Sequence, residues 1–207
     1  MRKILLLSVI LSSRNAQAQT SVSCSADDTT YFQNSGVADR ESWYGRALRR
    51  MGESRLCPAE GLVTYRFLWL RTFHRPVAVR VEKTRAGGQL WLKVLGGAGG
   101  YDPGRLVQDR TLRLTKGQWD SVAVLASGAH LWDLPSVEPA KVDTVNGQVR
   151  YWGGADGARW ILESVDGLRY HLVDRWTPTP SDAGLYYALC RYLLTLSRLP
   201  LTTAEIY

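Results

Sequence analysis

Residues 154–178 read GADGARWILESVDGLRYHLVDRWTP and carry the clearest indication of fold in the chain. Two runs rich in aromatic and branched residues, Arg159 to Val165 and Arg169 to Trp176, flank the dipeptide Asp166-Gly167. Asp-Gly between such runs favours a tight β-hairpin, because both residues tolerate the positive φ angles that a two-residue turn requires. We therefore predict a hairpin here, preceded by a turn at Asp156-Gly157.

Four further strands are predicted upstream. In LVTYRFLWLRTF (62–73) the odd positions are apolar or aromatic except for Arg71, which indicates a strand with one well-buried face. Alternation also predicts strands over Val77 to Lys83, Gln89 to Leu95 and Arg105 to Leu114. The glycines at 96–100 are not followed by the Lys-Ser or Lys-Thr of a phosphate loop, so we interpret them as a hairpin connection.

Three helices are predicted from apolar residues at helical spacing. The first spans Asp39 to Glu53, the second starts at a capping box of Thr115 and Gln118, and the third covers Asp182 to Ser197 with Ser181 as its cap. The third helix is expected to bury a stripe of four residues: Leu185, Leu189, Leu193 and Leu196. Residues 137–152 are interpreted as a looser connection.

The order of these elements is helix, four strands, helix, two strands, helix. It predicts the α+β class, with an antiparallel sheet of about six strands and helices packed mainly on one face. No internal repeat or low-complexity linker interrupts the pattern, so residues 39–207 are expected to form a single domain.

Residues 1–18 have the pattern of a signal peptide, and residues 19–38 that of a polar leader. Arg2 and Lys3 precede a compact apolar run, and Ala16-Gln17-Ala18 supplies the small residues of a cleavage site. The apolar run is too short to cross a bilayer as a helix, and no later run is long enough either. We therefore expect an exported protein, periplasmic or secreted, without a transmembrane helix.

The charge and the cysteines limit the choice of partner and compartment. The whole chain has 26 basic and 19 acidic residues, and residues 1–18 contain three of the basic ones and no acidic one. After their removal 23 basic and 19 acidic residues remain, which is a net charge of +4. The basic residues alternate with apolar ones instead of clustering, so no nucleic-acid partner is predicted. Cys24, Cys57 and Cys190 are three cysteines, so in the oxidising compartment that export implies they can form at most one disulfide within the chain. The sequence does not select among the three possible pairings.

Two of these cysteines also have individual interpretations. Cys190 lies in a helical apolar stripe and is interpreted as a buried small hydrophobe. A lipid anchor on Cys24 is an alternative, although Ser21 stands where a lipobox has an aliphatic residue.

Two motifs group this sequence with others. One is the run YRFLWLRTFHRP (65–76). The other is the spaced set Asp156-Gly157, Trp160, Leu162-Glu163, Tyr170-His171 and Arg175-Trp176-Thr177-Pro178. On these motifs the chain resembles a family of small exported bacterial proteins, from Trp43 to Tyr207. No activity is known to us for that family, so the resemblance implies no catalytic residue.

His171 and Asp174 are the residues that would form an acid–base pair. Alternation along the last predicted strand places them on opposite faces, whereas such a pair needs hydrogen-bond contact. No Gly-x-Ser-x-Gly elbow is present to supply a serine nucleophile. We therefore expect His171 and Arg175 to share a solvated or helix-covered face, pairing with Glu163 across the hairpin.

Arg71, His74 and Arg75 form a second polar cluster, at the end of the longest predicted strand. Arg71 interrupts an apolar face, and a buried guanidinium needs a carboxylate partner. The preferred interpretation is a buried pair of Arg71 with Asp174, and Glu163 is the other candidate partner.

The functional alternative is a cleft for an anionic group. Arg71, His74, His171 and Arg175 would line it, because guanidinium groups hold anions through planar bidentate contacts.

Neither a metal nor a cofactor is predicted. His74, His130 and His171 are not spaced as metal ligands on a helix, and no cofactor motif is present. The chain has eight tryptophans, which are interpreted first as a large aromatic core and second as a platform for carbohydrate stacking.

These observations predict a non-enzymatic exported protein that binds a partner protein or a component of the cell envelope. The alternative is a hydrolase or an anionic-ligand-binding enzyme that uses His171 with Arg71 and Arg175.

Overall fold

The structure of the 207-residue chain, a computed structural model, describes residues 24, 31–32, 41–138, 142–145, 148–151 and 156–207. The expected signal peptide and most of the expected polar leader lie outside these residues.

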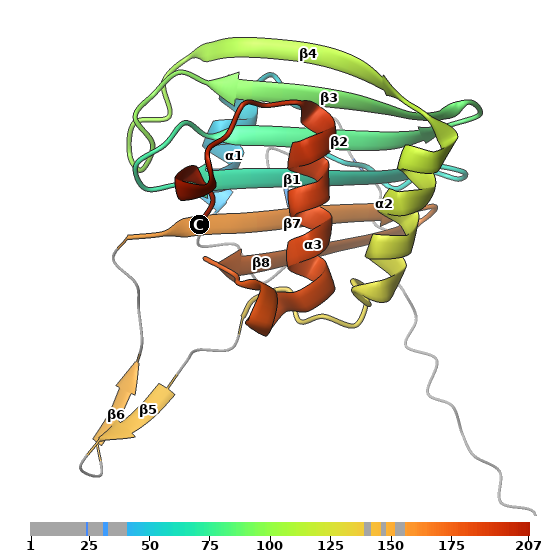
Figure 1. Ribbon diagram of the computed structural model, residues 1–207. Coiled ribbons are helices and arrows are strands. Elements are labelled where there is room, and N and C mark those ends of the chain that lie inside the picture. The colour runs from blue at the N-terminus through green and yellow to red at the C-terminus, as the bar shows by residue number, and fades with distance from the viewer. Residues whose placement is uncertain (1–23, 25–30, 33–40, 139–141, 146–147, 152–155) are drawn as a thin grey trace, which may run out of the picture.

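An antiparallel sheet of six strands forms the centre of the molecule (Figure 1). A meander of four strands supplies one part of it: β1 (Val63–Arg71), β2 (Val77–Thr84), β3 (Gly87–Leu95) and β4 (Leu106–Leu114). The predicted hairpin supplies the rest, as β7 (Ala158–Asp166) and β8 (Arg169–Trp176). The strand order β4-β3-β2-β1-β7-β8 places β7 beside β1, which joins the two halves of the sequence.

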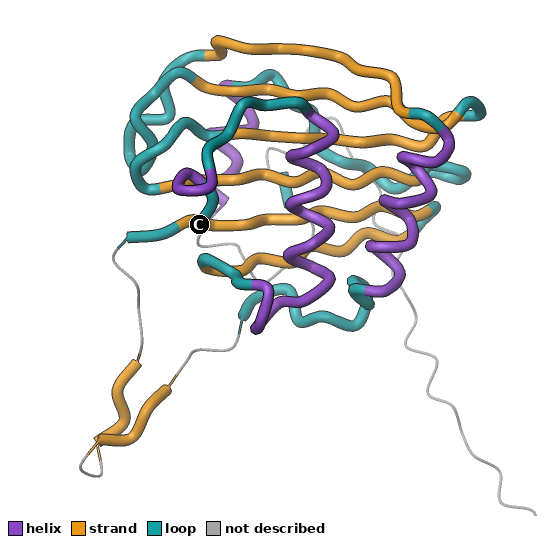
Figure 2. The backbone as a smooth tube through the Cα atoms, viewed as in Figure 1, coloured by secondary structure: helices purple, strands orange, loops and turns teal. Residues whose placement is uncertain are grey.

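Helices cover both faces of this sheet. In the described residues, α2 (Lys116–Gly128) and α3 (Pro180–Ser197) pack on one face, and α1 (Glu41–Arg50) lies on the other (Figures 1 and 2). The predicted α+β fold is therefore confirmed. No helix in the described part of the chain combines the length and the apolar composition that a membrane crossing requires.

The helices on the two faces create two hydrophobic cores. The larger core, under α2 and α3, contains the buried rings of Phe67, Trp69, Trp119 and Trp160. Three of the eight tryptophans are thus core residues, in agreement with the interpretation of a large aromatic core. The smaller core lies under α1 and includes Leu68, Leu70 and Ile161 of the sheet. The expectation that β1 has one buried face is thus incomplete, because both of its faces are buried.

The ends of α1 and α2 follow from local sequence. At the start of α2 the amide of Gln118 donates to Thr115 Oγ1 at 3.2 Å, and Gln118 Oε1 accepts from the Thr115 amide at 2.9 Å, so the predicted capping box is confirmed. Beyond α1, Gly52 has φ of +63° and its amide bonds to the carbonyl of Arg49. Glycine adopts this left-handed conformation at little cost, which ends the helix there.

The third helix differs from its prediction. Its N-cap is Thr179 rather than Ser181, and the Thr179 amide donates to Asp182 Oδ1 at 2.6 Å. The backbone is non-helical at Gly184, so the predicted stripe fails at its first member and Leu185 is 47% exposed. The stripe continues correctly from Leu189 onward, since Leu189, Leu193 and Leu196 are buried.

The stretch interpreted as a loose connection also contains regular structure. Strands β5 (Val142–Val145) and β6 (Gln148–Tyr151) pair with each other as a separate two-stranded antiparallel sheet. The predicted element order therefore omitted a short hairpin.

The structure selects one of the three cysteine pairings. Cys24 and Cys57 form a disulfide, and Cys190 is a buried free thiol, as its interpretation predicts. Desolvation raises the pKa of the Cys190 thiol far above its ordinary value. A disulfide sulfur cannot also carry a thioether-linked lipid, so the bridge argues against a lipid anchor on Cys24.

Candidate functional site

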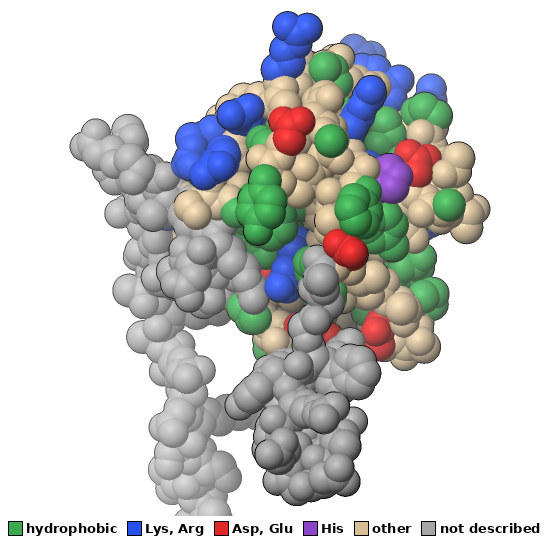
Figure 3. All heavy atoms as spheres, turned by 90° about the vertical axis from the view of Figure 1, so that its left-hand side faces the viewer, with side chains coloured by type: hydrophobic (Ala, Val, Ile, Leu, Met, Phe, Trp, Pro, Cys, Tyr) green, Lys and Arg blue, Asp and Glu red, His purple; other side chains and the backbone are tan. Residues whose placement is uncertain are grey.

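Three segments that are far apart in the sequence meet at one end of the sheet. They are the β1–β2 connection (72–76), the β3–β4 connection (96–105) and the chain that follows α3 (198–207) (Figure 1). Between them lies an open cavity of about 570 Å³. Figure 3 views this end directly and shows Lys and Arg, a histidine and hydrophobic side chains gathered on one face.

The lining of this cavity is polar on one part and apolar on another. The polar side chains are Arg71, His74, Arg75, Gln108 and Glu205, and the apolar ones include Phe73, Val77, Val94, Leu199 and Leu201. Among the lining side chains that the structure describes, only Glu205 is an acid. The cavity therefore combines positive charge with hydrophobic surface.

The glycine-rich β3–β4 connection builds one wall of the cavity. The Gly99 backbone packs so closely on the β1–β2 connection that a Cβ atom there would lie 2.5 Å from the carbonyl oxygen of His74. The amide of Gly100 donates to the Arg71 carbonyl at 2.9 Å, and the amide of Gly97 donates to Pro103 at 3.2 Å. Because these amides bond within the chain, the loop is a hairpin connection rather than a phosphate cradle, as predicted.

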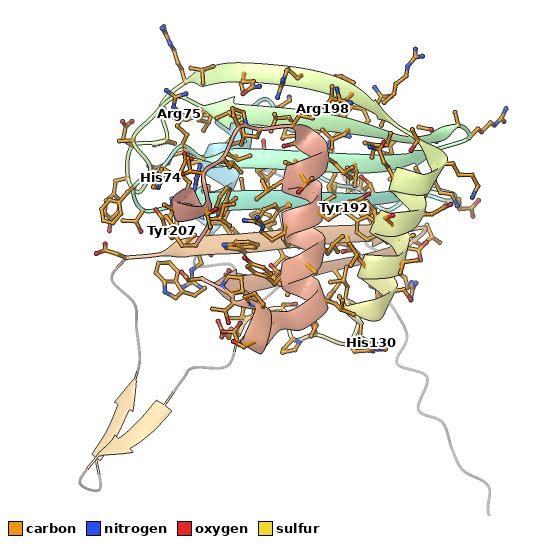
Figure 4. The ribbon with its side chains drawn as sticks, viewed as in Figure 1. His74, Arg75, His130, Tyr192, Arg198 and Tyr207 are labelled. Carbon is orange, nitrogen blue, oxygen red and sulfur yellow. A yellow bond between two sulfur atoms is a disulfide. The ribbon has the colours of Figure 1, made fainter. Side chains whose placement is uncertain are left out.

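The residues after α3 form the opposite wall, anchored by Tyr207. The main-chain oxygen of Tyr207 accepts hydrogen bonds from the indole nitrogens of Trp160 at 2.8 Å and Trp69 at 3.3 Å. Its hydroxyl accepts from the amide of Phe73 at 3.3 Å and lies 2.9 Å from Nδ1 of His74 (Figure 4). Which of the two groups donates depends on the tautomer of His74.

Arg71 is the most unusual residue of this lining. It is only 3% exposed, and its guanidinium lies 3.8 Å from the centre of the Trp69 ring. Nη1 donates to the carbonyl of Glu205 at 3.1 Å and Nη2 to the carbonyl of Arg75 at 2.8 Å, whereas Nε is buried and makes no hydrogen bond to any residue that the structure describes. The guanidinium thus has carbonyl partners and one unused donor.

No described carboxylate forms an ion pair with Arg71. The carboxylate of Glu205 is engaged elsewhere, since its Oε2 accepts from the amide and the hydroxyl of Thr202, each at 2.8 Å. These two hydrogen bonds lower the pKa of Glu205. Desolvation lowers the pKa of Arg71 to about 10, against smaller opposing effects of Tyr207 and Glu205, so the guanidinium is still charged at neutral pH.

Gln108 adds a donor to the same cavity. In the amide orientation that satisfies both residues, its side-chain oxygen accepts from Nε and Nη2 of Arg110 at 2.7 and 2.9 Å. The NH₂ group of Gln108 is then the part of the amide that can donate to a ligand.

The predicted ion pair of Arg71 with Asp174 is wrong. Arg71 lies opposite Ala158 on the face under α3, whereas Asp174 lies opposite Ile161 on the face under α1. On that face the hydroxyl of Tyr44 donates to Asp174 Oδ2 at 2.8 Å, and Arg159 is 3.6 Å from Oδ1.

His171 and Asp174 point to opposite faces of the sheet, as predicted. The ring nitrogen Nε2 of His171 lies 2.8 Å from the carbonyl oxygen of Leu134, beside the ring of Trp132. The predicted pairing of His171 with Glu163 is wrong, because Glu163 lies on the other face and bonds to Arg66.

Arg175 lies in a different cavity from Arg71. Its Nη1 donates to the carbonyl of Pro135 at 2.9 Å, and it lines a cavity of about 370 Å³ between α2, α3 and β8, together with Glu138 and Asp182. The structure therefore brings Arg71, His74 and Arg75 together and separates them from His171, Asp174 and Arg175. The predicted pairing of Arg175 with Glu163 is wrong for the same reason as that of His171.

Sequence reasoning missed three polar residues of this region: Gln108 and Glu205, which line the cavity, and Tyr207, which bonds to His74. The pattern Thr202-x-x-Glu205 is a capping box, and it was the available signal for the short helix η2 (Thr203–Glu205). Nothing in the sequence indicates that Tyr207 returns to the end of β1.

Comparisons with protein-family models, with curated proteins and with solved structures found no match to this chain. The described side chains contain no group of three or more His, Cys, Asp or Glu that could hold a metal ion. The geometry of the cavity is therefore the basis for a functional proposal.

Proposed function

We propose that this chain is an exported, non-enzymatic binding protein that holds an anionic group of its ligand, a carboxylate or a phosphate, against Arg71. The ligand is a component of the cell envelope or part of a partner protein. The observation that carries the proposal is the buried, charged Arg71, which lines the cavity and forms no ion pair with a carboxylate of the described residues.

A buried charge without a counter-charge is costly, and proteins usually pair it. Two carbonyl oxygens and the face of Trp69 compensate Arg71 in part, yet its Nε donor is unused. An anion in the cavity would neutralise the charge. Guanidinium groups suit carboxylates and phosphates because their donors match the spacing of two oxygens.

The neighbours of Arg71 favour the same ligand chemistry. Arg75 is exposed beside it, the His74 side chain also lines the cavity, and the NH₂ of Gln108 is a further donor. Val77, Val94, Leu199 and Leu201 provide an apolar surface for the body of the ligand. We therefore expect an amphipathic anion rather than a small inorganic ion.

The alternative of a hydrolase that uses His171 with Arg71 and Arg175 is not favoured by the geometry. Arg71 and Arg175 line two different cavities, and His171 bonds to a main-chain carbonyl. Catalysis by a shared site would require them within contact of one substrate.

Equilibrium binding of hexanoate, hexyl phosphate and uncharged hexanol, followed by isothermal titration calorimetry, tests this proposal. We expect binding of at least one of the two anions and none of hexanol, and comparison of the anions distinguishes a carboxylate from a phosphate ligand. Arg71→Met should abolish the binding and Arg71→Lys should weaken it, because lysine lacks the planar fork. Arg113→Met, which removes an exposed arginine on β4, is the matched control and should leave binding unchanged.

Two results would contradict the proposal. One is equal binding of hexanol and the anions, and the other is undiminished anion binding by a folded Arg71→Met protein.

A further inference from the structure

The two edges of the six-stranded sheet differ in whether another segment of the chain pairs with their backbone. The edge at β8 is paired in part, since the amide of Asp174 donates to the carbonyl of Ser136 at 2.8 Å and Val137 forms a parallel bridge to Asp174. The edge at β4 is nine residues long and lies at the margin of the sheet in Figure 1. No described backbone group pairs with its outer side.

An open edge of this length is a template for another strand. Its unpaired amides and carbonyls match those of any extended chain, so side chains decide what is added. Three even-numbered residues of β4 are engaged with the molecule itself: Arg110 donates to the carbonyl of Ser197 at 3.2 Å, and Leu112 and Leu114 pack on the larger core. The odd-numbered residues are exposed: Val107, Asp109, Thr111 and Arg113.

We infer that the β4 edge joins a second copy of this chain, with the two β4 strands antiparallel and centred on Thr111. In such a pair the two-fold axis is perpendicular to the sheet, so residues that lie opposite each other point to the same face. Centring on Thr111 places Asp109 of each copy opposite Arg113 of the other. Two ion pairs then form on the exposed face of the joined sheet.

Two other registers are unfavourable. Centring on Asp109 opposes two carboxylates, and centring on Arg110 opposes two guanidinium groups, and like charges directly opposite each other destabilise a strand pair. Charges on an edge strand usually prevent association. Here Asp109 and Arg113 are spaced so that each lies opposite the oppositely charged residue of the second copy.

The side chains of this pair are accessible. The side chain of Asp109 is 50% exposed although Lys93 lies 3.7 Å from it, and Arg113 and Val107 are exposed. A single added strand buries less surface than a standard interface, so the dimer is expected to be weak, with association visible only at micromolar concentration or above. This inference does not depend on the Arg71 cavity.

Charge reversal tests the dimer and its register. Sedimentation velocity of the wild type over a rising concentration series should show a monomer–dimer equilibrium. Asp109→Arg and Arg113→Asp should each weaken it by roughly tenfold or more, because each variant places two like-charged pairs at the centre of the interface. Mixing the two variants should restore association, since every basic side chain at these positions then meets an acidic one.

Three outcomes would overturn the inference. The wild type stays monomeric at all concentrations, the single charge reversals leave dimerisation unchanged, or the mixture of the two variants associates no better than each alone. Circular dichroism of both variants establishes that they are folded, and the double variant Asp109→Arg/Arg113→Asp, which exchanges the two charges, should dimerise like the wild type.

Discussion

Arg66 on β1 and Glu163 on β7 form a fully buried, bidentate ion pair across the centre of the sheet. Nε of Arg66 lies 2.6 Å from Oε2 of Glu163, and Nη2 lies 2.9 Å from Oε1. Nη1 also donates to the carbonyl of Ser54 at 2.5 Å and lies 3.4 Å from Glu53, which attaches the segment after α1 to the sheet. Burial lowers the pKa of Arg66, but the carboxylates of Glu163 and Glu53 together raise it above its usual value.

Arg66→Met should destabilise the protein by about 3–5 kcal/mol, because it leaves the carboxylate of Glu163 buried without a cation. Urea unfolding followed by fluorescence measures this free energy. The double variant Arg66→Met/Glu163→Leu should lose less than the sum of the two single variants, since it removes both charges together.

The exposed pair of Lys116 and Asp120, 2.7 Å apart on α2, is the control for this prediction. Lys116→Met should cost less than about 1 kcal/mol, as exposed ion pairs contribute little. Equal losses for Lys116→Met and Arg66→Met would contradict the buried position of the Arg66 pair.

The strands could be predicted from sequence because side-chain alternation is a local property. Alternation along 62–73 and 169–176 identified β1 and β8, and the Asp166-Gly167 signal predicted the pairing of β7 with β8, although the two turn residues are Gly167 and Leu168 because Asp166 pairs with Arg169. Side-chain alternation also placed His171 and Asp174 correctly on opposite faces of the sheet.

The pairing of β1 with β7 could not be predicted in the same way. These strands are joined by no turn, so no local signal states that Arg66 lies opposite Glu163 and Arg71 opposite Ala158. A shift of one residue exchanges the faces of a strand. For this reason the sequence suggested Asp174 as the partner of Arg71, whereas the buried pair belongs to Arg66.

The candidate cavity was predictable in part. The cluster of Arg71, His74 and Arg75 was visible because these residues are close in sequence. Gln108 and Tyr207 reach the same place only when β4 and the chain after α3 pack against the end of β1. Such long-range docking leaves no pattern in a single sequence.

The disulfide between Cys24 and Cys57 should contribute roughly 3–4 kcal/mol to stability, the loop-closure value for its sequence separation of 33 residues. Cys57→Ser should lower the free energy of unfolding by this amount, measured with urea. Addition of a reductant should have the same effect on the wild type and none on Cys57→Ser. A reductant effect on Cys57→Ser would show that another bond is responsible.

Cys190 should be unreactive in the folded protein. It is buried, and desolvation raises the pKa of its thiol, so both access and thiolate formation are suppressed. A colorimetric thiol titration at neutral pH should find no reactive thiol in the native, non-reduced wild type and one per chain after unfolding in urea. One fast-reacting thiol in the native protein would contradict the burial of Cys190.

His171→Asn should destabilise the protein by about 1–2 kcal/mol, because it removes the hydrogen bond to the carbonyl of Leu134. His130→Asn is the control, since the side chain of His130 is 77% exposed and asparagine tolerates its positive φ. The control should change stability by less than about 0.5 kcal/mol. Equal stability of both variants in thermal unfolding would argue that His171 has a role other than a structural one.

Gly99→Ala should destabilise the protein by about 1–3 kcal/mol and also weaken anion binding at Arg71. Gly99 has φ of +99°, and an added Cβ atom would lie 2.6 Å from the carbonyl oxygen of Arg71 and 2.7 Å from the amide of His74. Both contacts involve backbone atoms, so the glycine-rich connection must move away from the β1–β2 connection to make room.

Gly117→Ala is the matched control, because a Cβ atom at Gly117 meets nothing within 4 Å and Gly117 lies in α2. It should stabilise the protein by up to about 1 kcal/mol, since alanine favours the helix. Chemical denaturation and hexanoate or hexyl phosphate titrations of the two variants measure both effects. Wild-type stability and binding in Gly99→Ala would mean that the connection does not hold the wall of the cavity in place.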